Sequence, residues 1–303
     1  TTYLHNLLNP SRRPFSLVAF YRANRQWSSA LSGDFASFLQ AASFQDAYRL
    51  WDNASEGAAD LKSWAIAKSL ERFQTSSETG VLFDDIRDDE LALVNGAIHE
   101  AIEEFRGLRY DMKSKSLLVQ TQDEFMPFDN LSDGQQGTIG LVADIARRMC
   151  ILNPQLGEAT IRETEGVVLI DELDLHLHPG WQRNLTRGLK RAFPKVQFIV
   201  TSHSPQILAE LQPEEIILLE GGGTEHPQVS YGLDASRVLE EVMGTASRPL
   251  EVEEKLKQLF RTLETGSLDE AARQIESLRE KAPGVAELSR AEALLERKKI
   301  LGR

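Results

Sequence analysis

The chain contains three short segments whose residue types could act together on a phosphate group. They are Leu131-Ser132-Asp133-Gly134-Gln135, residues 167–172 (Val-Val-Leu-Ile-Asp-Glu) and residues 201–205 (Thr-Ser-His-Ser-Pro). The first precedes a helical pattern of apolar residues, and the free backbone N–H groups at a helix N-terminus bind phosphate. The Ser132 hydroxyl could add a donor, and Gly134 would let the backbone approach a ligand closely. The alternative is that Ser132 and Asp133 only cap the helix.

The second segment places two carboxylates directly after an apolar run, Asp171 and Glu172 after residues 167–170. This pattern is typical of a buried parallel strand that delivers its acids at the carboxyl edge of a sheet, where ligands bind. Phosphoryl transfer needs Mg²⁺ and a base for the attacking water, so we expect Asp171 to hold the metal and Glu172 to act on the water. The alternative is a solvated, acidic strand end.

The third segment follows another apolar run, residues 196–200, and places His203 at its end. We expect this imidazole to lie beside Glu172 and to hydrogen-bond the terminal phosphate. A structural role is the alternative, because imidazole fills many roles in proteins.

Together the three segments resemble the ATP-binding-cassette ATPases, in the soluble branch with the RecF, SMC and OLD-type proteins. Residues 131–135 resemble the signature motif, residues 167–172 the Walker B strand, and His203 the switch histidine. The resemblance implies ATP and Mg²⁺ as cofactors. It also implies that the signature of one subunit closes over ATP held by another, which gives a homodimer or higher homo-oligomer bridged by ATP.

Residues 173–179 (Leu-Asp-Leu-His-Leu-His-Pro) occupy the D-loop position, and their His-x-His-Pro form is similar to the OLD/RecF branch. The resemblance implies nucleotide contacts from Asp174, His176 and His178. His178 stands where the D-loop usually carries aspartate, which leaves its contact across a dimer open. A zinc site at His176 and His178 is the alternative, because paired imidazoles bind zinc.

From about residue 131 onward the chain resembles more closely the bacterial ATPases labelled as predicted ATP-binding proteins involved in virulence. The similar stretches are residues 141–148, 181–183, 193–194, 197–200 and 292–302. Members of this group accompany Septu and retron antiphage systems. The resemblance therefore implies an HNH nuclease as partner and, in retrons, a reverse transcriptase with its multicopy single-stranded DNA. A RecF-like DNA-repair ATPase and the nucleotide-binding subunit of a transporter remain alternatives.

The pattern Gly-x-x-x-x-Gly-Lys-Ser/Thr does not occur in these 303 residues, so the sequence lacks a Walker A loop to hold the phosphates. Residues 15–21 have the pattern of an interior strand that begins in the middle of a domain. We therefore expect about 100 residues, half a domain, to belong upstream. We also expect this chain not to hydrolyse ATP alone.

Composition indicates a cytoplasmic globular protein: 41% of residues are hydrophobic, 26% are charged, and no apolar run could span a membrane. The one cysteine, Cys150, is expected in the core. A net charge of −12 argues against a protein coated in nucleic acid, so any DNA contact would be a local patch. Candidate patches, with a solvated face as the alternative, are Arg12, Arg13, Arg22 and Arg25 near the start and residues 297–299 at the end.

The predicted fold class is α/β, an ABC-type P-loop ATPase lobe that is incomplete without Walker A and carries a helical insertion and a helical C-terminal tail. The predicted parts are residues 1–30 (start of the ATPase core), 31–115 (helical insertion), 116–245 (catalytic lobe) and 246–303 (helical tail). We expect the insertion to pack through Phe35, Phe38, Leu39, Trp51, Trp64 and Phe73. In the tail, the Ser-x-x-Glu spacing from Ser267 predicts a capping box. The tail could fold onto the ATPase lobe or dock a partner.

Overall fold

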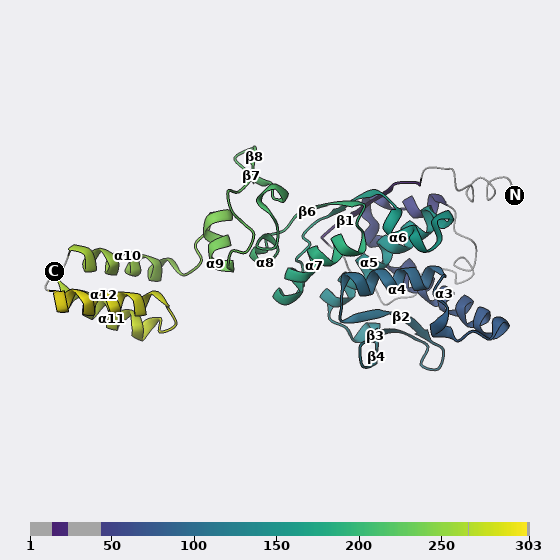
Figure 1. The fold of residues 1–303 in the computed structure, drawn as a ribbon, viewed down its shortest axis with the longest axis horizontal. Coiled ribbons are helices and arrows are strands. Elements are labelled where there is room, and N and C mark those ends of the chain that lie inside the picture. The colour runs from purple at the N-terminus through teal and green to yellow at the C-terminus, as the bar shows by residue number, and fades with distance from the viewer. Residues whose placement is uncertain (1–13, 24–43, 266, 302–303) are drawn as a thin grey trace. The chain divides into compact units, whose positions relative to one another are not determined.

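The computed structural model describes residues 14–23, 44–265 and 267–301. The chain forms two compact units, Thr1–Glu210 and Leu211–Arg303 (Figure 1). The boundary therefore lies after Glu210 and not at residue 245, where the sequence placed the end of the catalytic lobe. The reason is that residues 211–230 bond among themselves: the Ser230 hydroxyl donates to the Leu211 carbonyl at 2.7 Å.

A parallel sheet forms the centre of the first unit, with strand order β1-β5-β6. The strands are β1 (Leu17–Tyr21), β5 (Gly166–Ile170) and β6 (Val196–Val200). Leu17 pairs with Gly166, which in turn pairs with Val196. All three strands match sequence predictions. However, β6 contains no fully buried residue and Ile199 is 51% exposed, so the expectation of buried strands holds for one sheet face only.

The helices of the first unit are α3 (Ala58–Thr79), α4 (Glu90–Ala101), α5 (Asp133–Leu152), α6 (Thr160–Glu163), α7 (Pro179–Ala192) and α8 (Pro205–Leu208). Helix α5 packs against β1 of the parallel sheet, and α3, α4 and α6 pack against α5. Short 3-10 helices span Phe44–Tyr48, Trp51–Gly57, Phe83–Asp85, Phe128–Asn130 and Pro154–Ala159. Every residue of α5 from Thr138 to Leu152 is buried, so α5 is the core helix. Cys150 lies in this core, as expected, and burial raises the pKa of its thiol.

One buried ionic network ties α5 to β1. The fully buried Asp144 carboxylate accepts hydrogen bonds from the Tyr21 hydroxyl (2.9 Å), Arg147 Nη2 (2.7 Å) and Arg148 Nε (2.7 Å). Arg148 Nη1 also donates to the Ala47 carbonyl at 2.6 Å. A buried charge is tolerated only when it is paired and hydrogen-bonded, and this network satisfies both conditions.

The predicted helical insertion is partly wrong, because it contains a strand. An antiparallel sheet is formed by β2 (Phe105–Asp111), β3 (Ser116–Thr121) and β4 (Phe125–Pro127). The pairing of β2 with β3 shifts between Phe105 and Gly107, where Gly107 has φ of 149°. This bulge breaks the alternation of apolar residues by which a strand is recognised.

The predicted packing surface of the insertion is confirmed only in part. Trp64 is buried, and Phe73 packs against Phe83 with ring centroids 4.4 Å apart. Trp51 is 48% exposed, so its assignment to the packing surface was wrong. The predictions for Phe35, Phe38 and Leu39 lie outside the described residues.

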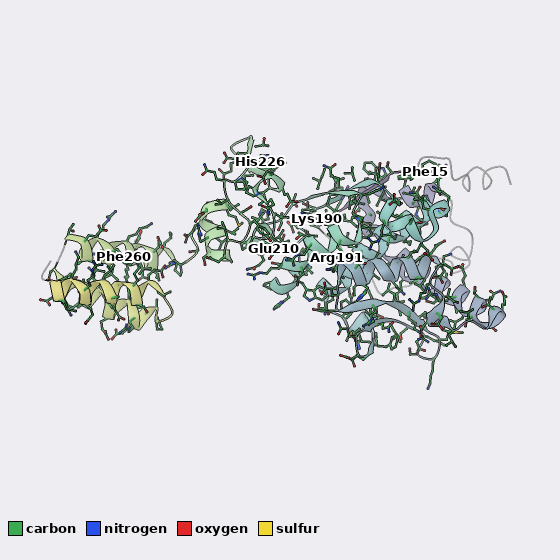
Figure 2. All side chains as sticks on the ribbon, in the orientation of Figure 1. Phe15, Lys190, Arg191, Glu210, His226 and Phe260 are labelled. Atoms are coloured by element: carbon green, nitrogen blue, oxygen red, sulfur yellow. The ribbon has the colours of Figure 1, made fainter. Side chains whose placement is uncertain are left out.

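The second unit begins with a short 3-10 helix (Pro213–Glu215) and a hairpin of β7 (Leu218–Glu220) and β8 (Gly223–Glu225), followed by α9 (Ala235–Arg237) and a π-helix (Val238–Val242). Three longer helices come next: α10 (Leu250–Thr265), α11 (Leu268–Lys281) and α12 (Glu287–Leu301). Their shared apolar core includes Leu259, Ile275 and Ala291. The Arg290 guanidinium lies over the Phe260 ring, which Figure 2 labels on α10. Helix α11 begins after Ser267 as predicted, but the Ser267 side chain makes no capping bond, so the predicted capping box is absent.

Candidate functional site

The acidic pair and the histidine lie at the same edge of the parallel sheet, at the carboxyl ends of β5 and β6. Backbone bonds fix this arrangement. The Asp171 N–H donates to the Tyr21 carbonyl at 2.8 Å, and the Leu173 N–H donates to the Thr201 carbonyl at 3.0 Å. The loop after β5, with Asp171 and Glu172, therefore runs beside the loop after β6, which carries His203.

Thr201 joins the two loops and was not singled out from the sequence. Its hydroxyl donates to Asp171 Oδ1 at 2.6 Å and accepts from the Glu172 N–H at 2.8 Å. Glu172 has a φ of +50°, which is costly for a residue with a side chain and is common at functional sites. The Thr201 hydroxyl thus holds the Asp171 carboxylate in one orientation, and it bonds the Glu172 backbone in a strained conformation. A threonine directly after an apolar strand, opposite an acid on the neighbouring strand, is the signal that could have identified it.

Asp174 links the same two loops a turn later. Its Oδ1 atom accepts from the Ser202 hydroxyl at 2.6 Å and from the His203 N–H at 3.3 Å. Asp174 therefore positions the backbone of His203, while the exposed imidazole remains available to a ligand. The nucleotide contact expected of Asp174 stays a prediction.

Ser132 caps helix α5, as the alternative interpretation expected, and it does so in a capping box with Gln135. The Gln135 N–H donates to Ser132 Oγ at 3.3 Å, and the Ser132 N–H donates to Gln135 Oε1 at 3.0 Å. Ser132 and Asp133 are exposed, whereas Leu131 and Gly134 are buried. The exposed pair at the helix N-terminus is thus open to a ligand, while Leu131 and Gly134 act through packing.

Gly134 packs against the loop after β5 of the same chain. A Cβ atom added to Gly134 would lie 2.2 Å from the His176 carbonyl oxygen. His176 itself has a φ of +60°. The glycine is therefore required for close contact between the start of α5 and the His176 backbone.

We expect Gly134→Ala to destabilise the protein by about 1–3 kcal/mol, because the new methyl group overlaps a backbone atom. Gly96→Ala is the matched control, since it changes an exposed glycine in the middle of α4 where nothing lies within 4 Å. There the better helix propensity of alanine should stabilise by about 0.5–1 kcal/mol. Urea unfolding of both variants measures the difference. Equal effects would show that the Gly134–His176 contact is unimportant.

His178 caps α7, accepting from the Gly180 N–H at 3.2 Å. In the part of the chain that is described, His176 and His178 are not in a group of three or more His, Cys, Asp or Glu residues that could hold a metal ion. Mg²⁺ does not need such a group, because it keeps water molecules and binds through one or two carboxylates plus substrate phosphates. Asp171 fits that ligand set.

Lys298, in the basic cluster at residues 297–299, has a structural role. Lys298 Nζ donates to the Leu263 carbonyl at 2.6 Å, which caps the end of α10. Arg22 donates to the Asp52 carbonyl at 3.3 Å. The remaining members of the first basic cluster, Arg12, Arg13 and Arg25, lie outside the described residues.

A family model described as "AAA domain, putative AbiEii toxin, Type IV TA system" matches residues 27–209, which is more than half of the chain and includes the acids, the histidine and the start of α5. The chain belongs to this family. The membership, with the parallel sheet and its flanking helices, confirms the predicted α/β P-loop ATPase fold with additional C-terminal helices. No described helix is long and apolar enough to cross a membrane.

Curated relatives of this AAA-domain protein include two retron ATPases and a Septu protein. The chain is 36% identical over 180 residues to the Retron Ec83 probable ATPase of Escherichia coli, covering 59% of this chain and 33% of that protein. It is 39% identical over 144 residues to the Retron Vc95 probable ATPase of Vibrio cholerae serotype O1 biovar El Tor, covering 45% and 27%. It is 28% identical over 196 residues to the Septu protein PtuA of Bacillus thuringiensis, covering 61% and 48%. The chain thus spans less than half the length of these relatives.

Among solved structures, the SMC head domain from Thermotoga maritima is similar at 17% identity with a TM-score of 0.31, covering 51% of each chain. The family match and the retron and Septu relatives agree with the group of ATPases that the sequence motifs predicted.

Proposed function

We propose that the chain is the ATP-binding and ATP-hydrolysing part of a bacterial antiphage defence complex of the retron or Septu type, acting in the cytoplasm. The observation that carries the proposal is the meeting of Asp171, Glu172 and the His203 loop at one sheet edge, joined through Thr201. The relatives named above support the defence role.

In this proposal each residue has one task. Mg²⁺, when bound with ATP, neutralises charge on the phosphates, and Asp171 would hold its water shell. Glu172 accepts the proton of the attacking water. His203 donates a hydrogen bond to the terminal phosphate. The phosphates also need a Walker A loop, whose pattern does not occur in these 303 residues.

We also propose that two copies meet head to tail, with the exposed Ser132 and Asp133 of one facing ATP on the other, and that this closure controls an HNH nuclease partner. In retron systems a reverse transcriptase and its single-stranded DNA would join the complex. The exposure of Ser132 and Asp133 at the N-terminus of α5 supports such a contact.

Ser132→Arg should block this closure, because a long cation would replace the small hydroxyl where the phosphate must approach. ATP should then no longer shift the assembly state in analytical ultracentrifugation. Ser132→Ala is the control: it removes the cap at a cost of about 1 kcal/mol but leaves the space open. An ATP-dependent shift that survives in Ser132→Arg would contradict the head-to-tail arrangement.

The function is tested by phosphate release from the complete ATPase with its Walker A loop present. We expect hydrolysis that EDTA abolishes, and Asp171→Asn should raise the Mg²⁺ concentration needed for half activity by at least ~10-fold. Hydrolysis that does not require a divalent cation would overturn the assignment of Asp171. Identification of chains that purify with the native complex tests the defence role: a recombination mediator without a nuclease would favour DNA repair instead.

A further inference from the structure

A cavity of about 240 Å³ lies in the first unit between the end of α4 and the exposed side of α7. Its walls include Trp181, Asn184, Arg187 and Arg191 from α7 and Glu104 from the segment after α4. Neither the acids after β5 nor His203 lines it, so this cavity is separate from the proposed ATPase site.

Two close contacts of α7 fix the walls of the cavity. At Gly188 the helix lies so close to α4 that an added Cβ atom would be 2.0 Å from the Ala101 carbonyl oxygen. Two turns earlier, the Trp181 ring packs edge-on against Phe105 with centroids 5.7 Å apart. The indole is therefore held in place at one end of the opening, while part of its surface remains exposed.

Helix α7 is also strongly basic, although the protein as a whole is acidic. It carries Arg183, Arg187, Lys190 and Arg191 and no acidic residue, in a chain with net charge −12. Steps of four, three and one residues place these cations on one side of a helix. Over eight residues at 1.5 Å each they extend about 12 Å along its axis. Figure 2 labels Lys190 and Arg191 on this helix.

The two arginines of the cavity form exposed ion pairs. Arg187 Nη2 contacts Glu210 Oε2 at 2.7 Å with the arginine 66% exposed, and Arg191 Nη1 contacts Glu103 Oε1 at 2.8 Å. Arg191 Nε also donates to the Glu100 carbonyl at 2.7 Å. Exposed pairs of this kind contribute little to stability, so a phosphate group can displace the carboxylates from the guanidinium groups at low cost.

We propose that this cavity binds a nucleotide unit, with the base against Trp181 and the phosphate on Arg187 and Arg191. An aromatic ring beside basic groups is the combination that binds unstacked bases, and guanidinium groups bind phosphate through paired hydrogen bonds. The Asn184 amide can both donate to and accept from a base edge, and the Glu104 carboxylate can accept from a base N–H. Because the base must leave its stack to enter, the ligand is a single strand or a free nucleotide, not a duplex. The extension of cations along α7 favours the strand.

The test measures fluorescence anisotropy of a fluorescein-labelled 12-nucleotide polydeoxythymidine strand with this chain at low salt. EDTA is present and ATP is absent, so the proposed ATPase site does not contribute. We expect micromolar binding or tighter. We expect Trp181→Ala and the double variant Arg187→Gln, Arg191→Gln each to weaken it at least ~10-fold. Arg183→Gln, on the same helix but outside the cavity wall, is the matched control and should cost less than about threefold.

Two further variants keep the test interpretable. Asn184→Ala changes an exposed side chain and should weaken binding without lowering the melting temperature, whereas loss of Trp181 also removes its contact with Phe105. Asp171→Asn with Glu172→Gln should bind the strand normally, which separates this site from the proposed ATPase function.

Comparison ligands show whether the bound nucleotide unit belongs to a single strand or is a free nucleotide. Labelled thymidine monophosphate binding as tightly as the strand, with the same loss in Trp181→Ala, would identify a free nucleotide as the ligand. The proposal is overturned if neither ligand binds at 100 µM, on the order of the weakest nonspecific DNA affinities. It is also overturned if polyglutamate of equal length binds as well as the strand, or if the cavity variants and Arg183→Gln lose affinity equally.

Discussion

Replacing Glu172 with glutamine in the complete ATPase is expected to leave ATP binding intact and to slow turnover at least ~100-fold, the usual range for loss of a general base. Glutamine keeps the size and hydrogen-bonding reach of the side chain but cannot take a proton from water. The backbone at this position is fixed by the bond from the Glu172 N–H to Thr201 Oγ1, which the substitution preserves. Single-turnover phosphate release, together with equilibrium binding of labelled ATP, separates the two effects.

Glu165→Gln is the control for that experiment. Glu165 precedes the same strand at its opposite end, is exposed, and lies away from the carboxyl edge of the sheet. Glu165→Gln removes one negative charge, as Glu172→Gln does, but should leave turnover within about twofold of the unmodified protein, in line with the small effects of exposed surface changes. Full turnover in Glu172→Gln would remove Glu172 from the proposed role.

Asp144→Asn should produce the largest loss of stability, about 3–5 kcal/mol, because it leaves Arg148 as a buried cation without its counter-charge. Both Asp144 and Arg148 are less than 2% exposed. Urea unfolding measures the free energy of unfolding. Arg187→Gln removes one partner of an exposed ion pair and should cost less than about 1 kcal/mol. Similar costs for the two variants would show that the buried network is not a main source of stability.

The same network predicts how stability depends on pH. Burial acts to raise the pKa of Asp144, but Arg148 and Arg147 outweigh it and lower this pKa below its ordinary value of 3.8. Because the Asp144 pKa is lower in the folded state than in the unfolded state, ionised Asp144 stabilises the folded protein at pH values above the ordinary carboxyl pKa. This stabilisation is lost as the pH falls through the lowered pKa of the folded state. Burial first, and then Asp144, raise the pKa of Tyr21 above 10.0. That contribution is present below pH 10 and is lost as pH rises through the raised pKa.

The free energy of unfolding, measured from pH 2 to pH 12, tests the loss of stability predicted in acid and the loss predicted in alkali. Asp144→Asn should make the loss of stability in acid less steep, and Tyr21→Phe should do the same in alkali. If Tyr21→Phe leaves the alkaline limb unchanged, the hydroxyl–carboxylate bond does not contribute as described.

The sequence predicted those elements whose signal is local. The strands β1, β5 and β6 are short apolar runs, and the start of α5 follows from a serine and a glycine just ahead of a helical pattern of apolar residues. The prediction failed where a distant contact changed the local pattern. A bulge at Gly107 disguises β2, since the Asn95 amide of α4 bonds the backbone of Leu108. Trp51 is apolar by type but exposed, because composition alone does not show which side of a segment meets the core.

By itself, the sequence determined which chemical groups are present and in what order: an acid pair after one strand, a histidine after another, and a serine and glycine before a helix. Only the tertiary structure decided which groups meet. Tyr21 bonds Asp144 with its side chain and Asp171 with its carbonyl oxygen, which connects the core helix to the acidic loop. The physical reason is that such contacts join residues more than 100 positions apart. Their energy depends on the packing of whole elements, and no pattern within a short window records it.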